Sequence, residues 1–231
     1  MILKPMGLTG ILVQFTQEIS ETVGSQVTAM NQAILSARLP GVVETIPAYA
    51  ALTVRYDPFV TTYDTLCGSI RELADTAVTG QQKQGRVVRI PVCYGSAYGE
   101  DLPIVAEHAG MSEAEVVQLH ASRAYRIFML GFLPGFPYLG GMDERLVTPR
   151  KQTPRTKIPA GSVGIGGQQT GIYPMESPGG WQLIGRTPII IFAPGRPLPY
   201  QAGDSIQFVP ITPEAFERIH AAEKEGKPWR L

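Results

Sequence analysis

In the first part of the chain, segments with the hydrophobic pattern of a strand are followed by segments with the pattern of a helix. The apolar run at 11–15 predicts a strand. A helix is expected to open at Ser20, because apolar residues then recur at steps of three and four as far as Ile34. Two β-branched runs, at 42–47 and 51–56, predict two further strands.

The same pattern predicts a second helix and a further strand. The helix is expected to begin after Thr61 or Thr62 and to end near Gly80. The run at 86–94 predicts a strand, and the polar stretch at 79–85 is the best candidate for a linker. The order is βαββαβ, which is typical of ferredoxin-like domains, and the last strand can belong to either side of the linker.

Two short helices and a strand are predicted next. Ala109-Gly110 separates the helices, and the second is expected to begin at Ser112 with a capping box to Glu115 and to run to about Ser122. The apolar stretch at 124–132 predicts a buried strand.

The composition changes after residue 131. Residues 131–199 contain more than half of the 25 glycines and more than half of the 20 prolines, which excludes long helices there. Short strands are predicted at 162–167, 181–185, 188–194 and 203–210. This pattern predicts a β-barrel or β-sandwich closed by a surface helix at 213–225. The sequence therefore predicts an α+β protein with domains at 1–85 and 86–231.

Charge and cysteine content narrow the class of protein. Lys and Arg number 20, as do Asp and Glu, so the zero net charge offers no attraction to nucleic acid or acidic lipid. No apolar run is long enough for a membrane span, and the first ten residues do not resemble a secretion signal. Cys67 and Cys93 are expected to be buried, reduced thiols, which favours a cytoplasmic location.

The glycine-rich segment 160–171 suggests a phosphate loop but does not match one. No Lys follows its glycines, and a dinucleotide-type pattern that starts at Gly164 and Gly166 has Gln169 where a third glycine is needed. Two interpretations stay open. The glycines form tight turns and bulges, or their backbone N–H groups form a nest that binds an anion.

The three histidines do not have the spacing of a metal site. His120 is expected at the C-terminal end of its helix, where the helix dipole favours the charged imidazolium. It is either a capping and packing residue or a proton donor or acceptor beside a binding site. His220, on the last helix, is expected to be solvated.

The segment 150–159 carries Arg150, Lys151, Arg155 and Lys157. It is either a solvated loop or a rim that attracts a carboxylate or phosphate, and Arg155 is the residue we expect to contact the anion.

The stretch GFLPGFPYLGG, residues 131–141, combines glycine, proline and large rings without any charge. Glycine and proline repeatedly displace bulk around these rings, which favours a preformed apolar groove with exposed backbone polar groups. We expect this stretch to be one wall of a binding site and SVGIGGQQTGIYP to be the facing wall.

These residues resemble a known family. The stretches GFLPGFPYLGG and IPAGSVGIGGQQTGIYPMESPGGWQLIGRTP, together with VVETIPAYAALTVRYDP and RIPVCYG, are similar to the 5-oxoprolinase B-subunit family, which includes the KipI kinase inhibitor and the allophanate hydrolase subunit 1-like region of urea carboxylases. The resemblance covers nearly the whole chain. It implies a ferredoxin-like domain followed by a cyclophilin-like β-barrel domain.

The resemblance also implies an activity and partners. Members work with subunits A and C to open 5-oxoproline (pyroglutamate) to L-glutamate with ATP and Mg, and the chain alone is expected to be inactive. With no matching nucleotide loop here, ATP is expected at a site shared with or supplied by the partners. Proton transfer is assigned to His120. Substrate-binding residues carried over from the family motifs are Phe132, Pro134, Gly135, Phe136, Tyr138, Gln169, Thr170, Tyr173 and Trp181, to which Arg155 is added on physical grounds.

Two alternative functions remain. A KipI-like regulator would bind and inhibit a sensor histidine kinase, and the same surface could serve both roles. A carboxyl-transfer partner for urea ranks last, because this chain has no biotin-attachment motif.

Overall fold

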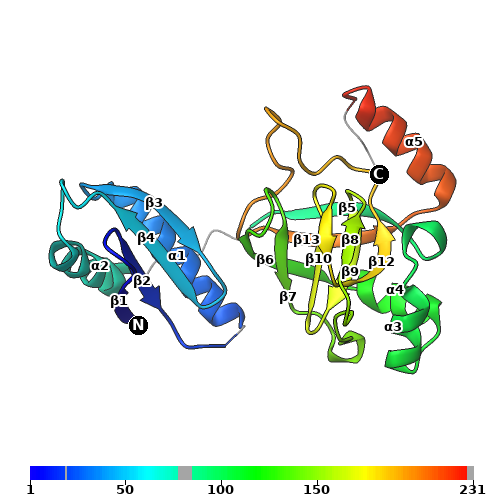
Figure 1. The fold of residues 1–231 in the computed structure, drawn as a ribbon, viewed down its shortest axis with the longest axis horizontal. Coiled ribbons are helices and arrows are strands. Elements are labelled where there is room, and N and C mark those ends of the chain that lie inside the picture. The colour runs from blue at the N-terminus through cyan, green and yellow to red at the C-terminus, as the bar shows by residue number, and fades with distance from the viewer. Residues whose placement is uncertain (19, 78–84, 228–231) are drawn as a thin grey trace. The chain divides into compact units, whose positions relative to one another are not determined.

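The computed structural model describes residues 1–18, 20–77 and 85–227, and the chain divides into two compact units at 1–84 and 85–231 (Figure 1). The predicted boundary lies one residue later. The first six residues of the linker proposed at 79–85 and the predicted helix end near Gly80 lie outside the described residues. No helix in the described ranges is long and apolar enough to cross a membrane.

The first unit contains a four-stranded antiparallel sheet in the order β1-β2-β4-β3. Its strands are β1 (Ile2–Pro5), β2 (Gly10–Gln14), β3 (Val42–Pro47) and β4 (Ala51–Tyr56). Alternate residues of the central strands point into the core, where Ile11, Val13, Leu52 and Val54 are fully buried. The buried face of each central strand thus follows the period of two that any β-strand has.

Helices α1 (Glu21–Ala37) and α2 (Tyr63–Ala77) share a core with this sheet. The side chain of Ser20 caps α1 by accepting a hydrogen bond from the backbone N–H of Val23 at 3.3 Å. Thr62 accepts one from the N–H of Thr65 at 3.2 Å, so it is the capping threonine of α2. Cys67 of α2 and Cys93 of the second unit are both buried and free, as predicted.

The fourth strand of the first unit's sheet is not the one that the sequence predicted. The predicted last strand, β5 (Val87–Tyr94), belongs to the barrel of the second unit. Its place beside β2 is taken by β1, which sequence patterning did not identify because it is short and mostly exposed. The first unit therefore has the element order ββαββα.

A closed seven-stranded barrel forms the second unit, in the order β10-β7-β6-β13-β5-β12-β9 (Figure 1). Its remaining strands are β6 (Ala124–Leu130), β7 (Pro137–Gly140), β9 (Ser162–Gly166), β10 (Gln169–Ile172), β12 (Gln182–Arg186) and β13 (Ser205–Pro210). Strands β5 and β13 pair in parallel, and the other neighbours in the barrel pair antiparallel. A mixed α+β chain with a closed barrel confirms the predicted fold class.

Helices and smaller elements surround the barrel. They are the 3₁₀ turns η1 (Ser96–Tyr98) and η2 (Glu144–Leu146), the helices α3 (Leu102–Ala109), α4 (Glu113–Ala121) and α5 (Pro213–Lys224), and the two-stranded sheet of β8 (Arg155–Ile158) and β11 (Ser177–Gly179). The predicted capping box between Ser112 and Glu115 at the start of α4 is confirmed. Helix α5 is not a purely surface element, because Phe216, Ile219 and Glu223 are buried.

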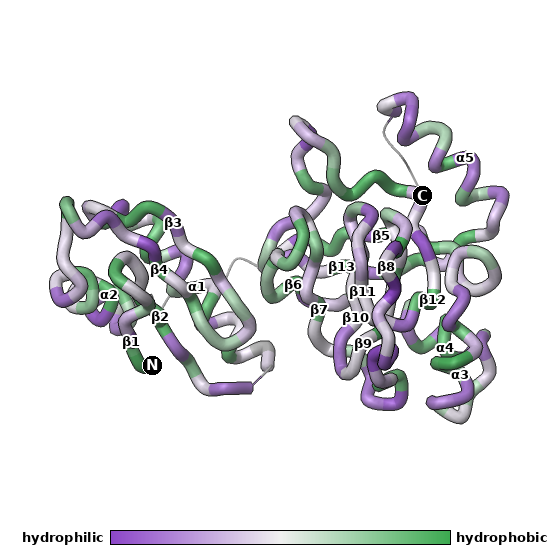
Figure 2. Tube along the Cα trace, viewed as in Figure 1, coloured by the Kyte–Doolittle hydropathy of each residue, from purple (hydrophilic) through white to green (hydrophobic). Residues whose placement is uncertain are grey.

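Two predictions about the barrel segments were wrong. The apolar run at 188–194 is not a strand, and Figure 2 shows it as an apolar coil. Ile189 and Ile191 nevertheless enter the core, so burial explains the apolar residues without strand pairing. Conversely, the second part of GFLPGFPYLGG forms strand β7, although its glycine and proline content indicated a loop.

Candidate functional site

The rings that we predicted to line a groove are mostly core residues. Phe136, Tyr173 and Trp181 are only 2%, 2% and 5% exposed, and they pack with Ile158 and Leu183. We call these five residues the aromatic cluster. The ring of Phe136 meets Tyr173 and Trp181 edge to face, with centroids 5.3 and 5.4 Å away. These three rings therefore serve packing in this structure, which corrects the groove interpretation for them.

The glycines around the rings leave room for them. A Cβ atom on Gly166 would lie 2.4 Å from the indole of Trp181, and one on Gly140 would lie 2.1 Å from the ring of Phe128. Both distances are too short for any side chain. The Gly-rich and ring-rich composition of this block thus has a structural cause, because the rings lie directly on the strand backbones.

Other predicted site residues do reach the surface. Phe132 is 63% exposed and has a positive φ of 65°, which is rare for a bulky residue. Pro134 is exposed, whereas Tyr138 on β7 and Gln169 on β10 are half-buried. Gly135 is buried, and its carbonyl accepts a hydrogen bond from the hydroxyl of Tyr200 at 2.9 Å.

His120 lies fully buried among the barrel strands. Its Nδ1 is 2.8 Å from the hydroxyl of Tyr94, and its Nε2 is 2.8 Å from Oγ1 of Thr170. The Thr170 hydroxyl donates to the carbonyl of Gly164 at 3.1 Å. Since that hydrogen is used, the Thr170 oxygen accepts from Nε2–H, and Nδ1 accepts from Tyr94. The chain of hydrogen bonds fixes one neutral tautomer.

The expectation that the helix dipole keeps the His120 imidazole positively charged is wrong. Burial lowers the pKa of His120 from 6.5 to about 3, so the imidazole is neutral near pH 7. A helix C-terminus stabilises a cation by only about 0.3–1 kcal/mol at exposed sites, which desolvation exceeds here. The ring also stacks on Phe208, with centroids 4.6 Å apart. This placement favours a structural role over the predicted proton transfer.

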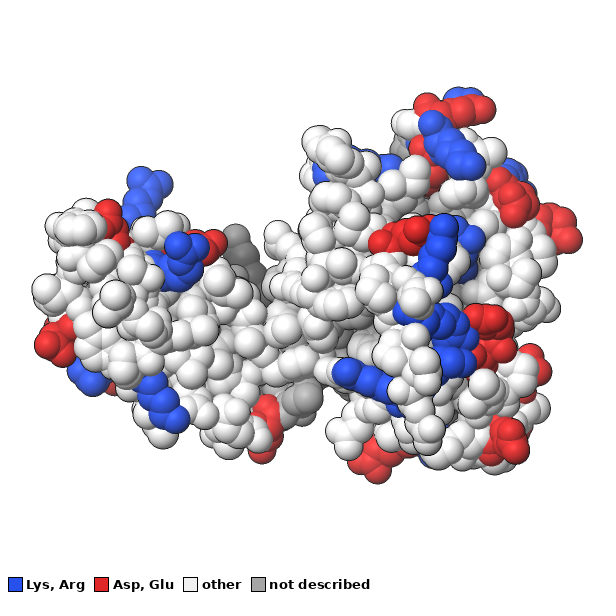
Figure 3. All heavy atoms as spheres, viewed as in Figure 1, with Lys and Arg blue, Asp and Glu red and all other residues white. Residues whose placement is uncertain are grey.

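Arg155 is already engaged by acidic residues. Its Nη2 lies 2.8 Å from both carboxylate oxygens of Asp101 and 2.8 Å from Glu100. Lys151 also contacts Asp101, at 3.2 Å. The expected anion-binding role of Arg155 is therefore filled by the protein itself. Figure 3 shows basic side chains in a run on the barrel unit, with acidic side chains beside them.

Arg150 differs from its neighbours in this basic segment. Its guanidinium carbon lies 5.8 Å from the ring centre of Trp181. Within the described ranges, it forms no ion pair. Arg150 is therefore the basic residue of 150–159 whose charge is not paired with an acidic side chain of the described residues.

Asp101 is expected to stabilise the barrel strongly. Burial would raise the pKa of Asp101, but hydrogen bonds from Arg155, the backbone N–H of Leu183 and Lys151 lower it overall. We expect Asp101→Asn to lower the free energy of unfolding by about 2–3 kcal/mol in urea titrations at pH 7. Because the folded pKa is lowered, the difference from the wild type should shrink as the pH falls below the ordinary value of 3.8. An unchanged difference at low pH would contradict the ionic origin.

The glycine-rich segment 160–171 is a strand hairpin and not an anion nest. Gly164 pairs with Gly171 and with Leu183, and Gly166 pairs with Gln169, so these residues are part of the barrel ladder. The turn interpretation holds for Gly161 and Gly167, which have positive φ angles of 83° and 65°, and is wrong for the glycines inside the strands. The segment does not fit the phosphates of ATP. Among the described residues, no group of His, Cys, Asp and Glu could hold a metal ion.

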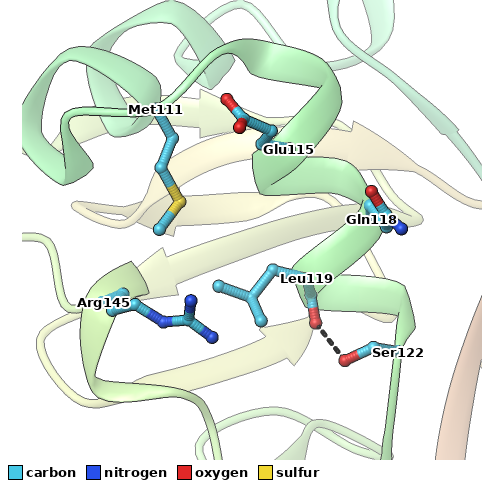
Figure 4. A pocket seen from close by; sticks show the side chains of 6 residues that line it. All are labelled: Met111, Glu115, Gln118, Leu119, Ser122 and Arg145. Atoms are coloured by element: carbon cyan, nitrogen blue, oxygen red, sulfur yellow. Dashed lines mark hydrogen bonds between the residues drawn. The ribbon is translucent and has the colours of Figure 1, made fainter.

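One surface hollow lies between α4 and the η2 turn (Figure 4). It has a volume of about 300 Å³ and is lined by Met111, Glu115, Gln118, Leu119, Ser122 and Arg145. Arg145 pairs with Asp143 at 2.8 Å, and Glu115 accepts hydrogen bonds from Ser112. Its charged groups are thus already satisfied, which makes it a poor candidate for recognising a ligand.

A second hollow, which we call the α5 hollow, lies beside helix α5. It has a volume of about 190 Å³ and is lined by residues 174–176 and 186–190 with Ala160, Phe192 and His220. Most of these positions fall in the block 158–188 that carries the family resemblance. His220 was expected to be solvated, but it is half-buried and its Nδ1 lies 3.0 Å from the carbonyl of Pro188.

The sequence contained one signal for the α5 hollow. Glu176 is the sole formal charge between Ile158 and Gly185. The other members lie far apart along the chain, so patterning could not bring them together. None of the residues predicted to bind substrate lines either hollow.

Comparison with known proteins identifies the family. The family model described as "Carboxyltransferase domain, subdomain C and D" matches residues 1–201. The 5-oxoprolinase B-subunit of Bacillus subtilis (strain 168) is 40% identical over 236 residues, which covers 97% of each chain. The 5-oxoprolinase B-subunit of Escherichia coli O157:H7 is 43% identical over 208 residues, covering 89% of this chain and 94% of that protein.

A solved structure agrees with these relatives. The crystal structure of TTHA0988 matches with a TM-score of 0.77 and 38% identity, over 87% of this chain and 40% of that chain. The match in sequence, length and fold has one explanation: the chain belongs to the 5-oxoprolinase B-subunit family.

Proposed function

We propose that this chain is the B-subunit of an ATP-dependent 5-oxoprolinase, which opens 5-oxoproline to L-glutamate together with subunits A and C. The observation that carries the proposal is the 40% identity, over 97% of both chains, with a protein named as the B-subunit of 5-oxoprolinase. A subunit name indicates an assembly of several chains, and we place that assembly in the cytoplasm.

The reaction needs more than a binding surface. Water must add its oxygen to the lactam carbonyl carbon, the ring C–N bond must break, and the nitrogen must leave as an amine. An unstrained amide is a poor electrophile, so its oxygen must be activated and the site must exclude bulk water. ATP would supply the activation. The glycine-rich segment 160–171 pairs as strands and does not fit the phosphates of ATP, so we assign nucleotide binding to a site that is shared with the partner subunits or supplied by them.

In this proposal, the chain contributes a rigid barrel and part of the substrate site. The hydrogen bonds of His120 with Tyr94 and Thr170 connect helix α4 to strands β5 and β10. The α5 hollow, between α5 and the loop before β13, would form part of the substrate site. Packed, neutral and fully bonded groups keep their geometry without a ligand, which reduces the cost of ordering a site on binding.

Reconstitution tests the proposal. We expect the purified chain to show no 5-oxoproline-dependent ATP hydrolysis, and we expect activity when subunits A and C are added. The assay follows phosphate and glutamate release, with the A–C pair lacking this chain as the control. Turnover by the single chain would contradict the subunit assignment, and no turnover from the three chains together would contradict the reaction.

A further inference from the structure

We propose that the α5 hollow is a binding site for a small carboxylate that also carries an N–H group, the chemical class of a cyclic amide acid. The identification of this ligand as 5-oxoproline rests on the proposed function. The existence and chemistry of the site rest on the residues that line it.

The size and walls of the α5 hollow fit a small ring. Its volume of about 190 Å³ is below the roughly 300–1,000 Å³ of sites for drug-sized ligands. Pro174, Met175, Ile189 and Phe192 supply apolar surface. A hydrocarbon ring of five or six atoms would bury its faces against these side chains.

Arg186 provides the group that would recognise a carboxylate. Its Nε donates to the carbonyl of Ala160 at 2.9 Å, which fixes the plane of the guanidinium. No acidic side chain in the described part of the chain lies within ion-pairing distance of it. The Nη groups therefore remain able to bind a carboxylate, for which a planar guanidinium is well suited.

His220 provides an acceptor for an N–H group. Nδ1 lies 3.0 Å from the carbonyl of Pro188, and a carbonyl only accepts hydrogen bonds, so Nδ1 carries the hydrogen. In the neutral ring, Nε2 is then an acceptor. Nothing in the described ranges binds Nε2. Arg186 and His220 together match a ligand with one anionic group and one N–H donor.

A buried carboxylate on α5 holds the wall of the hollow in place. Glu223 accepts hydrogen bonds from the backbone N–H of Ile190 at 3.1 Å and from Arg196 at 2.8 Å. It is only 2% exposed. The coil that supplies this wall is thus fixed to α5 before any ligand binds, which favours binding by lowering its ordering cost.

The acidic residue in the lining does not oppose this assignment. Glu176 pairs with Lys157 at 3.0 Å, and its side chain is 58% exposed. Its charge is compensated by that lysine and screened by water.

The seven methionines of the chain allow the site to be located directly. We would label their methyl groups with ¹³C and titrate the full chain, alone and with subunits A and C, with 5-oxoproline. We expect saturable shifts of the Met175 signal. The Met111 signal, from the hollow beside α4, should not move. Shifts at Met111 without Met175, or no response in either preparation, would overturn the proposal.

Two analogues test the chemistry of recognition. Cyclopentanecarboxylate lacks the N–H group and 2-pyrrolidinone lacks the carboxylate. Both are expected to bind at least about tenfold more weakly than 5-oxoproline, because each leaves one polar group unpaired. Equal affinity of all three compounds would overturn the assignment of Arg186 and His220.

Variants test the same two residues. Arg186→Gln is expected to weaken binding at least about tenfold, since it removes a charged hydrogen bond, while Arg218→Gln, on the exposed face of α5, should bind as the wild type does. Urea midpoints would confirm that both variants fold. Wild-type affinity in Arg186→Gln would contradict the proposal.

The two proposals can fail separately. If the three-subunit complex does not hydrolyse 5-oxoproline but Met175 still responds to it, the proposed function fails and the site stands. If the complex is active and Met175 responds in neither preparation, the site fails and the function stands.

Discussion

Phe136→Ala is expected to lower the free energy of unfolding of the barrel unit by about 3–5 kcal/mol, the usual cost of truncating a buried aromatic residue. The ring is 2% exposed and meets Phe132, Tyr138, Tyr173 and Trp181 at centroid distances between 5.1 and 5.6 Å. Removing it leaves a cavity at the centre of the aromatic cluster, because the strand backbones around it cannot collapse.

A matched control lies in the same segment. Phe132 is the same residue type, four positions earlier, and is 63% exposed. We expect Phe132→Ala to change the unfolding free energy by less than about 1 kcal/mol, because little area is buried there. Both tryptophans, at 181 and 229, belong to the second part of the chain, so fluorescence in urea reports on that unit.

This pair of variants decides between the two interpretations of GFLPGFPYLGG. Equal and small losses of stability would contradict the core assignment of Phe136 and would restore the predicted groove. A large loss for Phe136 alone would show that the segment is mainly a packing element.

Replacing His120 with leucine is expected to be the second most damaging change. The hydroxyl of Tyr94 would lose its partner, and the hydroxyl of Thr170 would keep only its hydrogen bond to the carbonyl of Gly164. Each interior hydrogen bond lost in this way costs about 1–3 kcal/mol. We expect a total loss of about 2–5 kcal/mol in urea unfolding at pH 7. His108→Gln, at an exposed position near the end of α3, is the control and should unfold like the wild type.

The pH dependence gives an independent test of the neutral state. The pKa of His120 is lowered to about 3 in the folded chain, below the ordinary 6.5, so the unfolded chain binds the additional proton between these values. Stability from this residue is therefore present above pH 6.5 and is lost as the pH falls toward 3. Stability measured from pH 7 to pH 4 should fall more steeply for the wild type than for His120→Leu. Parallel curves would show that His120 is not buried in its neutral form.

Local patterns predicted much of the fold. Helix caps form between close neighbours in the chain, so the helix starts at Ser20 and Ser112 can be derived from a short window of sequence. The same holds for the alternation of buried residues in β2 and β4, because a strand has a fixed period. Strand β1 and strand β7 were missed for the converse reason. One is mostly exposed, the other contains Pro and Gly, and both exist because a partner strand pairs with them.

The candidate site was less predictable than the fold. The sequence located the block that characterises the family. However, it predicted that the rings line a groove and that Arg155 contacts an anion, whereas the structure buries three of the rings and pairs Arg155 with Asp101. Asp101 lies more than fifty positions before Arg155 in the chain, so no local pattern could show that the two are paired.

The sequence by itself determined the helix starts at Ser20 and Ser112, the two buried thiols and the family. Tertiary structure alone decided that His120 is neutral, that three of the rings are core, and that Arg186 and His220 line one hollow. The physical reason is that helix caps and apolar periods act between near neighbours, whereas burial, ion pairing and the shape of a cavity depend on which distant segments the closed barrel brings together.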